Sequence, residues 1–331
     1  RPVCLVLSTD TTTSYVLNLA KLSAPAVKTA LNSVLLNEDI PKVGYDLKST
    51  IKIGYELGLG FAGVGHDVQV AAFVLNCLRR EQTLHDLAVS ELGYDGSSLE
   101  DLDDEEFCAR AGETVAVIRA LTHQQRTELK AAPKFPALVR DIEWPVIPVL
   151  ADMEYAGIQL DSAYLKKFSV EIDDAISDFE QQIYGYADQE FNIASPSQLA
   201  EILFEKLDLP KQGIKKGKTG YSTAASELDK LRGKHPIIDL ITQYREVAKL
   251  KNTYVDTLPT QVDENSRLHT TFNMVTAQTG RLSSNDPNLQ NIPTRTDLGR
   301  RIRTAFVAGK GNKLVSADYS QFELRLAAVL A

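Results

Sequence analysis

Thr-Gly-Arg-Leu-Ser-Ser at residues 279–284 and Asp-Pro-Asn-Leu-Gln-Asn-Ile-Pro at residues 286–293 open an unusual stretch of this chain. Gly-Arg-Arg-Ile-Arg follows at residues 299–303, and Val-Ser-Ala-Asp-Tyr-Ser-Gln-Phe-Glu-Leu-Arg comes last, at residues 315–325. From Arg267 to Lys313 there are eight Lys or Arg and two Asp or Glu, although the whole chain has a net charge of -8. This stretch is therefore a basic, amide-rich region within an acidic protein.

Basic and amide side chains together are typical of surfaces that bind nucleic acids. Lys and Arg neutralise phosphates, while Asn and Gln hydrogen-bond to base edges. After the basic region, the short apolar segment Leu314-Val315 predicts a strand that brings Asp318 to the start of a helix. We therefore predict a nucleic-acid-binding surface that leads into a single carboxylate.

The composition, 44% hydrophobic and 24% charged, is that of an ordinary globular protein. Its 331 residues are enough for two or three domains with their own cores. No apolar run approaches the roughly 18 residues of a membrane span, and no signal peptide opens the chain. The cysteines, Cys4, Cys77 and Cys108, are odd in number and scattered, which argues against a disulfide framework or a zinc site and favours a reducing cytoplasm.

Alternating strands and helices in the first 130 residues predict an α/β domain. We expect strands at residues 3–7, 15–19 and near Val43, and helices at residues 23–36 and 47–57. His66-Asp67 is suited to capping a further helix. Residues 86–106 carry nine acidic side chains and no Lys or Arg, which we interpret as a solvated loop and helix start.

The middle of the chain, residues 131–265, predicts a helical arm. Residues 144–155 form an apolar helix pattern ended by Gly157, and Asp161 and Ser195 are each suited to capping a following helix. Residues 236–258 read as one long helix, whose polar side carries Arg245, Lys249 and Lys251. A basic loop between the helices carries Lys215, Lys216 and Lys218; it is either a solvated lysine loop or a phosphate contact, and its acidic setting favours the contact.

The four C-terminal segments resemble the family A DNA polymerases, the bacterial DNA polymerase I group. Residues 318–325 are similar to motif A of that family, and the segments at residues 279–284 and 288–293 are similar to its primer-template-binding palm strands. All four stand in the family's order, and the resemblance extends more weakly over the whole chain.

The resemblance implies a multidomain protein with α/β and all-α parts. Residues 1–130 would form a ribonuclease H-like 3′–5′ exonuclease-type α/β domain that is incomplete at its N-terminus. Residues 131–265 would form a helical thumb, and residues 266–331 the first strands of the antiparallel palm sheet, including motif A. The basic part of such a thumb grips duplex DNA, which implies DNA contacts by Lys215, Lys216, Lys218, Arg245 and Lys249.

Exonuclease chemistry needs several carboxylates around two metal ions, and the matching positions lack them. Residues 43–50 resemble the second exonuclease motif, but Thr50 stands where the motif has a metal-binding Asp. Cys108 and Gly112 stand at the Tyr and Asp of another motif, and we interpret Asp67 as a helix cap. We therefore predict a degenerate exonuclease domain. The alternative is an active 3′–5′ exonuclease that uses Asp10, Asp46, Asp67 and Glu113.

The palm resemblance implies that Arg281 reaches the minor groove at the primer terminus. There it would accept any correct base pair, because the minor groove presents acceptors at similar places in all four pairs. The plainer alternative is a surface Arg in an ion pair. DNA contacts are likewise implied for Asn288, Gln290, Asn291, Arg295 and Gln321. Arg303 matches an arginine that braces phosphates or motif A, whereas Arg300 and Arg301 could form only a solvated face.

Asp318 matches one of two family carboxylates that bridge a pair of Mg²⁺ ions, and the Tyr319 carbonyl would add a further metal ligand. The resemblance assigns catalysis to Asp318, Glu323 and Arg281, and nucleotide binding to Tyr319, Ser320, Gln321 and Glu323. Glu323 matches the residue that excludes ribonucleotides, although Ser320 and Glu323 also form a capping-box pattern. Phe322 replaces the usual Ile, which would alter the packing of the nucleotide pocket.

The family's second carboxylate motif and its fingers helix would lie beyond Ala331, and the chain starts at Arg1 without Met, so both ends look cut. We expect the parent protein to synthesise DNA in replication and repair, from primer-template DNA and deoxynucleoside triphosphates, as a monomer in the bacterial cytoplasm and nucleoid. The 331 residues alone would be inactive. A non-enzymatic alternative is a module that only binds duplex DNA.

Overall fold

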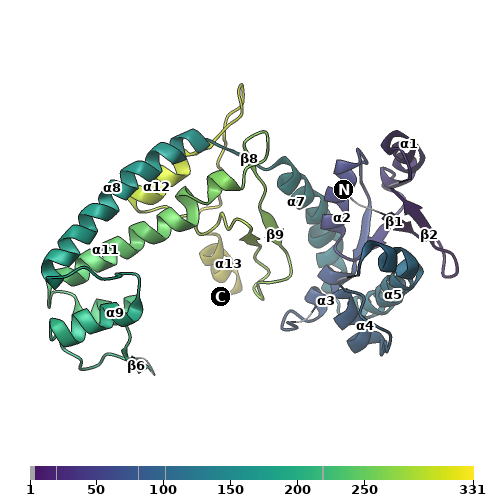
Figure 1. The fold of residues 1–331 in the computed structure, drawn as a ribbon. Coiled ribbons are helices and arrows are strands. Elements are labelled where there is room, and N and C mark those ends of the chain that lie inside the picture. The colour runs from purple at the N-terminus through teal and green to yellow at the C-terminus, as the bar shows by residue number, and fades with distance from the viewer. Residues whose placement is uncertain (1–3, 20, 81, 101, 218–219) are drawn as a thin grey trace. The chain divides into compact units, whose positions relative to one another are not determined.

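The computed structural model describes residues 4–331 except 20, 81, 101, 218 and 219 (Figure 1). It has a mixed α/β character, with helices and several small sheets. The chain forms two compact units. The first holds the chain up to Gly157 together with His269–Gln290, and the second holds Ile158–Leu268 together with Asn291–Ala331.

The N-terminal strands of the first unit form two pairs. β1 (Cys4–Leu7) pairs antiparallel with β2 (Tyr15–Asn18). β3 (Lys42–Gly44) pairs parallel with β4 (Val64–Asp67), so that Gly44 lies opposite Asp67. The predicted strands at residues 15–19 and near Val43 are confirmed, as is the first strand from Cys4 onward, since residue 3 lies outside the described residues.

Helices make up about half of the first unit, and most of them begin at a capping side chain. They are α1 (Ala24–Leu35), α2 (Leu47–Glu56), α3 (Val68–Leu75), α4 (Leu84–Leu92), α5 (Asp104–Ala131), α6 (Phe135–Leu138) and α7 (Trp144–Ala156). Ser23, Asp46, Asp67, Thr83 and Asp103 accept hydrogen bonds from the first free N–H groups of α1 to α5. Gly157, at a φ of 60°, ends α7 as predicted.

The acidic residues 86–106 are only partly a solvated loop. Asp103–Glu106 are exposed at the start of α5, as predicted. The preceding helix α4, however, was not predicted, because acidic residues surround its few apolar positions. Leu84, Leu87 and Ala88 of α4 are buried against α5.

Several apolar clusters hold the first unit together. One joins α2 and α7 through Ile51 and Ile147, which are both fully buried, and includes Trp144. Met274 and Val275 pack against the same cluster, so a segment far along the sequence belongs to this core. Each fully buried Ile contributes about 1.5–3 kcal/mol relative to an exposed one, so the α2–α7 contact is a major part of the stability of this unit.

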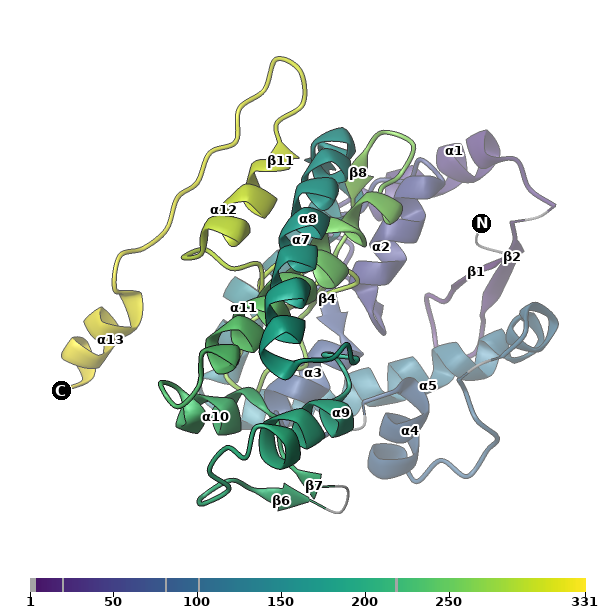
Figure 2. The same ribbon diagram turned by 60° about the vertical axis from the view of Figure 1, so that its left-hand side comes forward.

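Two long helices, α8 (Ser162–Ala187) and α11 (Pro236–Leu250), run side by side in the second unit (Figures 1 and 2). The recurrence of apolar residues along 165–183 predicts a packed helix face, and four of them are buried in α8, namely Leu165, Phe168, Ile172 and Ile183, while Phe179 is half-buried. A three-stranded antiparallel sheet accompanies the helices, with β5 (Ile158–Leu160) between β8 (Arg267–Leu268) and β11 (Phe306–Val307).

Smaller elements lie between α8 and α11 in the sequence: α9 (Pro196–Glu201), α10 (Ala225–Leu228) and the hairpin of β6 (Lys216–Gly217) with β7 (Gly220–Tyr221). Their apolar side chains form one cluster with the facing ends of α8 and α11. Ser195 caps α9 as predicted, but the pattern Ser195-x-x-Gln198 does not form a complete capping box: the Ser195 N–H donates to the Asn192 carbonyl at 2.9 Å, and the Gln198 side-chain oxygen accepts the Asn192 N–H at 2.8 Å.

Three predicted elements differ from the structure. The helix predicted at residues 236–258 is α-helical only to Leu250 and continues as a π-helical turn, Lys251–Val255, where the Lys251 ammonium pairs with Asp173 and Asp256. Residues 268–274 alternate between apolar and polar side chains, a pattern that predicts one strand, but the chain is interrupted at His269-Thr270, whose side chains bond to Glu154 and Ser284.

The strand predicted at Leu314-Val315 is absent from the described residues. Residues 312–319 have no regular structure, and both apolar side chains are exposed, because no neighbouring strand of the described chain pairs with them (Figure 2). α13 (Phe322–Leu330) follows. Across the described ranges, no helix is long and apolar enough to cross a lipid bilayer.

Candidate nucleic-acid interface

The strand pair β9 (Thr271–Asn273) and β10 (Ser283–Asn285) carries the first predicted DNA-contacting residue. Ser283 lies opposite Asn273, so the residues between the strands form a closed loop. Gly280, at a φ of 75°, turns the chain, and its N–H donates to the Ala277 carbonyl at 2.9 Å. Arg281 follows immediately, just before β10, and is exposed.

A buried hydroxyl pair, Thr270 and Ser284, holds the segment after β10. Their oxygens lie 2.7 Å apart, and both residues are buried. The Thr270 hydroxyl also lies 2.8 Å from the Pro287 carbonyl, and the Leu289 N–H donates to the Ser284 hydroxyl at 3.0 Å. These bonds fold residues 286–290 back against β10, and sequence reasoning missed them because Thr and Ser carry no apolar signal.

Asn288 and Gln290 lie on the segment that this hydroxyl pair holds. The Asn288 side-chain oxygen accepts the Gln290 N–H at 3.1 Å, and the Gln290 side-chain amide donates to the Leu282 carbonyl at 3.2 Å. Gln290 is exposed and Asn288 is half-buried. The structure therefore places Arg281 just before β10 and Asn288 and Gln290 just after it, and the bond from Gln290 to Leu282 joins the two flanking segments.

Arginines of the second unit lie on and beside α12 (Asp297–Thr304). Arg295 and Arg303 are exposed, as is Asn291. Arg300 pairs with Asp297 on its own helix, which fits the predicted solvated face.

Arg301 does not fit that description. Its guanidinium lies 4.0 Å from the centre of the Phe168 ring and pairs with Glu171, so it fastens α12 to α8. The pair with Glu171 further raises the pKa of Arg301.

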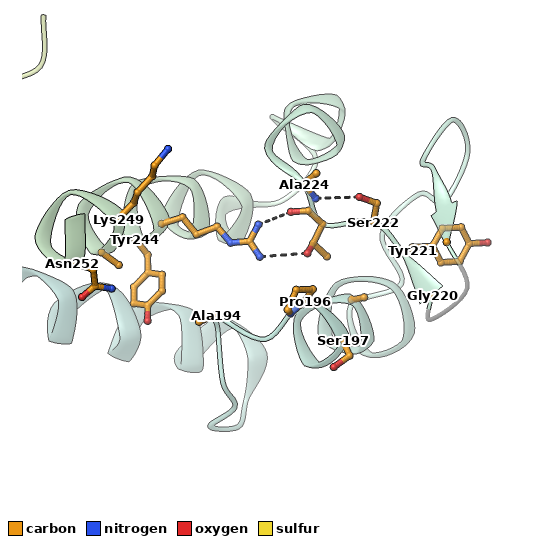
Figure 3. A pocket seen from close by; sticks show the side chains of 15 residues that line it. Ala194, Pro196, Ser197, Gly220, Tyr221, Ser222, Ala224, Tyr244, Lys249 and Asn252 are labelled. Carbon is orange, nitrogen blue, oxygen red and sulfur yellow. Dashed lines mark hydrogen bonds between the residues drawn. The ribbon is translucent and has the colours of Figure 1, made fainter. Parts of the chain in front are cut away.

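A cavity of about 700 Å³ lies between α9, β7 and α11 (Figure 3). Tyr244, Lys249 and Asn252 line it from the helix side, and Ser197 and Tyr221 line it from the other side. The guanidinium of Arg245 is half-buried there, where it donates to the Thr223 carbonyl and, at 3.3 Å, to the Thr223 hydroxyl. Arg245 is therefore committed to a protein contact, whereas Lys249 is exposed.

The predicted basic loop forms the β6–β7 hairpin and the segment that precedes it. Lys215 and Lys216 are exposed, and the Lys216 ammonium lies 5.3 Å from the centre of the Tyr221 ring. The Lys215 N–H donates to Glu227 at 3.0 Å, which anchors the hairpin to α10. Lys218, the third predicted lysine, lies outside the described residues.

The carboxylate segment of the second unit is fully exposed. Asp318, Tyr319 and Ser320 precede α13, and the rings of Tyr319 and Phe322 lie 5.6 Å apart. The predicted Ser320–Glu323 capping box is wrong: Gln321, at a φ of 54°, occupies the N-cap, without a side-chain cap bond. Glu323 therefore lies in the first turn, where its charge still suits the helix dipole.

The acidic residues of the exonuclease alternative serve local structure. Asp67 is buried and accepts the N–H groups of Gln69 and Val70, at 2.9 and 3.0 Å, and of Leu47, at 2.6 Å, so its predicted capping role is confirmed. Asp10 accepts hydrogen bonds from Thr12 and Thr13, and Asp46 accepts one from Ser49. Glu113 accepts hydrogen bonds from Arg110 and Tyr94. Within the described part of the chain, no three His, Cys, Asp or Glu side chains gather to hold a metal ion.

A buried histidine, His66, precedes Asp67 on β4. Its Nε2 lies 3.0 Å from the Gln125 side-chain oxygen, and its ring packs against Trp144 at 5.4 Å. Burial lowers the pKa of His66 from 6.5 to about 4. Burial also raises the pKa of the Asp67 carboxyl from 3.8 to about 6, despite the three N–H donors.

We predict an acid-sensitive contribution of His66 to stability. The pKa of His66 is 6.5 in the unfolded chain and about 4 in the folded chain, so between these values protonation of His66 favours the unfolded chain. The contribution of His66 to the free energy of unfolding is therefore complete above pH 6.5 and is lost as the pH falls to 4. The free energy of unfolding of the wild type minus that of His66→Phe should fall by about 3 kcal/mol over this interval. The measurement is urea unfolding followed by the fluorescence of Trp144, the only tryptophan.

The subtraction matters because Asp67 has the opposite pH dependence. Its raised pKa makes the folded chain bind a proton more readily than the unfolded chain between pH 6 and 3.8, which increases stability as the pH falls. Both proteins contain Asp67, so its effect cancels in the difference. A difference that stays constant with pH would contradict the assignment to His66.

Comparison with known proteins identifies the family. The sequence model of DNA polymerase family A matches residues 162–331. The chain is 39% identical to DNA polymerase I of Synechocystis over 323 residues, which are 94% of this chain and 33% of that protein. It is 47% identical to the thermostable DNA polymerase I of Thermus thermophilus over 228 residues, 68% of this chain and 27% of that protein.

A solved structure gives the same answer. The polymerase domain of Pol1 from M. smegmatis, in complex with DNA primer-template and dNTP, matches with a TM-score of 0.86 and 35% identity, over 98% of this chain and 56% of that one. The chain spans about a third of the length of the curated relatives that it matches. It belongs to DNA polymerase family A.

Proposed function

We propose that this chain contributes to DNA-templated DNA synthesis, in which a primer 3′-OH is joined to a deoxynucleoside triphosphate. The observation that carries the proposal is the β9–β10 strand pair, because Arg281 lies just before β10 and Asn288 and Gln290 lie on the segment folded back just after it. The solved relative, the Pol1 domain of M. smegmatis, was determined with primer-template DNA and dNTP. Both ligands suit a surface that is basic, amide-rich and exposed.

We further propose the domain assignment that the sequence suggests. Residues 1–130 would be a degenerate, ribonuclease H-like exonuclease-type domain, residues 131–265 the thumb, and residues 266–331 the start of the palm. The parallel β3–β4 pair and the paired helices α8 and α11 support the first two assignments. We also propose a monomer in the cytoplasm of a bacterium, close to the nucleoid.

Each site residue has a proposed task. Arg281 donates to minor-groove acceptors, and Asn288, Gln290, Asn291, Arg295 and Gln321 contact template and primer. Lys215, Lys216, Lys218 and Lys249 contact phosphates, while Arg245 holds the thumb surface through Thr223. Ser320, Gln321 and Glu323 contact the incoming nucleotide, with Glu323 against its sugar.

Divalent metal ions are general in this family, and Mg²⁺ fits the donors that the chain offers. The Asp318 carboxylate and the Tyr319 carbonyl are hard oxygen ligands on an exposed segment. Bound Mg²⁺ would lower the pKa of the attacking hydroxyl and neutralise the triphosphate. Two ions need more than one carboxylate, and Asp318 is the one that these residues supply, so the 331 residues alone should not extend a primer.

The test is single-nucleotide extension of a labelled primer-template in Mg²⁺, with the product of the whole gene beside the 331-residue chain. We expect the product of the whole gene to extend the primer. The 331-residue chain should bind DNA in a salt-sensitive manner without extending the primer. Binding without extension in both would favour the duplex-binding alternative. Degradation of single-stranded DNA in Mg²⁺ by the 331 residues would favour the exonuclease alternative.

Replacing Arg281 by alanine should weaken primer-template binding by about 1–3 kcal/mol, the contribution of one good groove contact. Kd should rise accordingly in a fluorescence-anisotropy titration at fixed salt. Arg140→Ala is the matched control, because Arg140 is an exposed arginine of the same unit that pairs with the adjacent Asp141. Equal effects of the two substitutions would show that Arg281 contributes only general charge.

A further inference from the structure

Glu154 of α7 is a buried carboxylate to which the proposed function assigns no task. Its side chain is 0% exposed and accepts hydrogen bonds from two other elements. Lys48 and Lys52 of α2 pair with its two oxygens, Lys52 at 2.6 Å. The backbone N–H of Phe272, in the middle of β9, donates to the same carboxylate at 2.7 Å.

A second bond joins the same two segments. The Nδ1 of His269 lies 2.7 Å from the Glu154 carbonyl oxygen, so the ring nitrogen donates to it. His269 and Phe272 flank the buried hydroxyl of Thr270, which bonds to the segment after β10. The strand pair that carries Arg281 is therefore tied to α7 on one side and to its own following loop on the other.

The charges in this cluster depend on one another. Lys48 is about as buried as a core residue, with a side chain only 10% exposed, and a buried charge without a partner is costly. Burial raises the pKa of Glu154, but the bonds from Lys48, Lys52 and Phe272 outweigh it and hold that pKa below its ordinary value. The carboxylate is therefore ionised at neutral pH and remains an acceptor for β9.

We propose that Glu154 is a positioning residue for primer-template binding: it joins α2 to β9 and so sets the strand pair whose flanking segments carry Arg281, Asn288 and Gln290. Lys48, its partner, lies in the segment 43–50 that resembles an exonuclease motif. That segment thereby serves as a brace for the DNA-contacting strands. The inference rests on the proposed function, since it concerns the same DNA-contacting residues.

The experiment separates positioning from stability with three variants of the 331-residue chain. Glu154→Leu removes the acceptor for β9 and leaves Lys48 buried without its partner. Lys48→Met/Glu154→Leu removes both charges, and such an apolar replacement of a buried pair commonly restores stability. The control Glu91→Leu breaks a similar buried pair, because Glu91 of α4 bonds to Arg79 at 2.5 Å and to Gln125 at 3.3 Å.

Binding to primer-template DNA is measured by anisotropy at a temperature where circular dichroism shows every variant folded. We expect Kd to rise about tenfold in Glu154→Leu and to stay raised in the double variant, while Glu91→Leu keeps the wild-type value. Hydrogen exchange should show loss of protection at residues 271–273 and 283–285 in both Glu154 variants.

The outcomes separate this inference from the function on which it rests. A wild-type chain that does not bind primer-template DNA would overturn the proposed function and this inference together. Wild-type binding that Glu154→Leu leaves unchanged would overturn the inference alone. Recovery of wild-type affinity in the double variant would also overturn it, because the effect would then be one of stability.

Discussion

Replacing Asp318 by alanine should reduce primer extension by the product of the whole gene about a thousandfold, equivalent to about 4 kcal/mol of transition-state stabilisation. Asp318 supplies the metal-binding carboxylate proposed for this part of the protein, and the neighbouring Tyr319 offers only a carbonyl. The side chain is exposed, so its removal should leave the thermal stability unchanged. The measurement is single-turnover extension with saturating DNA and nucleotide.

A matched control distinguishes catalysis from general charge. Asp229 is an exposed carboxylate of the same unit that pairs with Arg232, and Asp229→Ala should extend the primer at the wild-type rate. DNA binding should survive in Asp318→Ala, since the groove and phosphate contacts lie elsewhere. Extension at the wild-type rate by Asp318→Ala would show that the resemblance to motif A misidentifies the metal-binding carboxylate.

Local signals in the sequence predicted much of the fold. The caps at Asp67, Asp161 and Ser195 and the helix end at Gly157 depend on neighbouring residues alone, and each lies where the pattern placed it. The prediction of a strand at Leu314-Val315 was wrong, because a strand does not depend on neighbouring residues alone. A strand needs a partner as well as a pattern, and the described residues provide none there.

The supports of the candidate site could not be predicted, because they join residues far apart in the sequence. Lys48 and Glu154 are 106 positions apart, and Arg301 and Glu171 are 130 apart. Ordinary charged residues of this kind look like a solvated face when only their neighbours are known. The proposed DNA-contacting residues were assigned from their motifs, whereas no motif pointed to the side chains that hold their segments in place.

Replacing Asp67 by alanine should destabilise the first unit by about 3 kcal/mol. Loss of a helix cap costs about 1 kcal/mol, and the buried Leu47 N–H that Asp67 also accepts would lose its partner, which costs about 1–3 kcal/mol more. The control is Asp161→Ala, which removes an exposed cap with a single bond, to the Tyr164 N–H at 2.9 Å, and should cost about 1 kcal/mol. Urea unfolding followed by Trp144 fluorescence measures the first change, and circular dichroism measures the second.

The same variant tests whether the domain proposed for residues 1–130 has nuclease activity. A carboxylate that is retained for metal binding often lowers the stability of the fold. Its removal therefore usually leaves the fold intact while the activity disappears. Asp67 has the reverse character, because all of its described bonds go to backbone N–H groups of the fold. If Asp67→Ala remained stable but lost Mg²⁺-dependent degradation of single-stranded DNA, the result would support the exonuclease alternative. Destabilisation without any nuclease in the wild type would establish it as a scaffold.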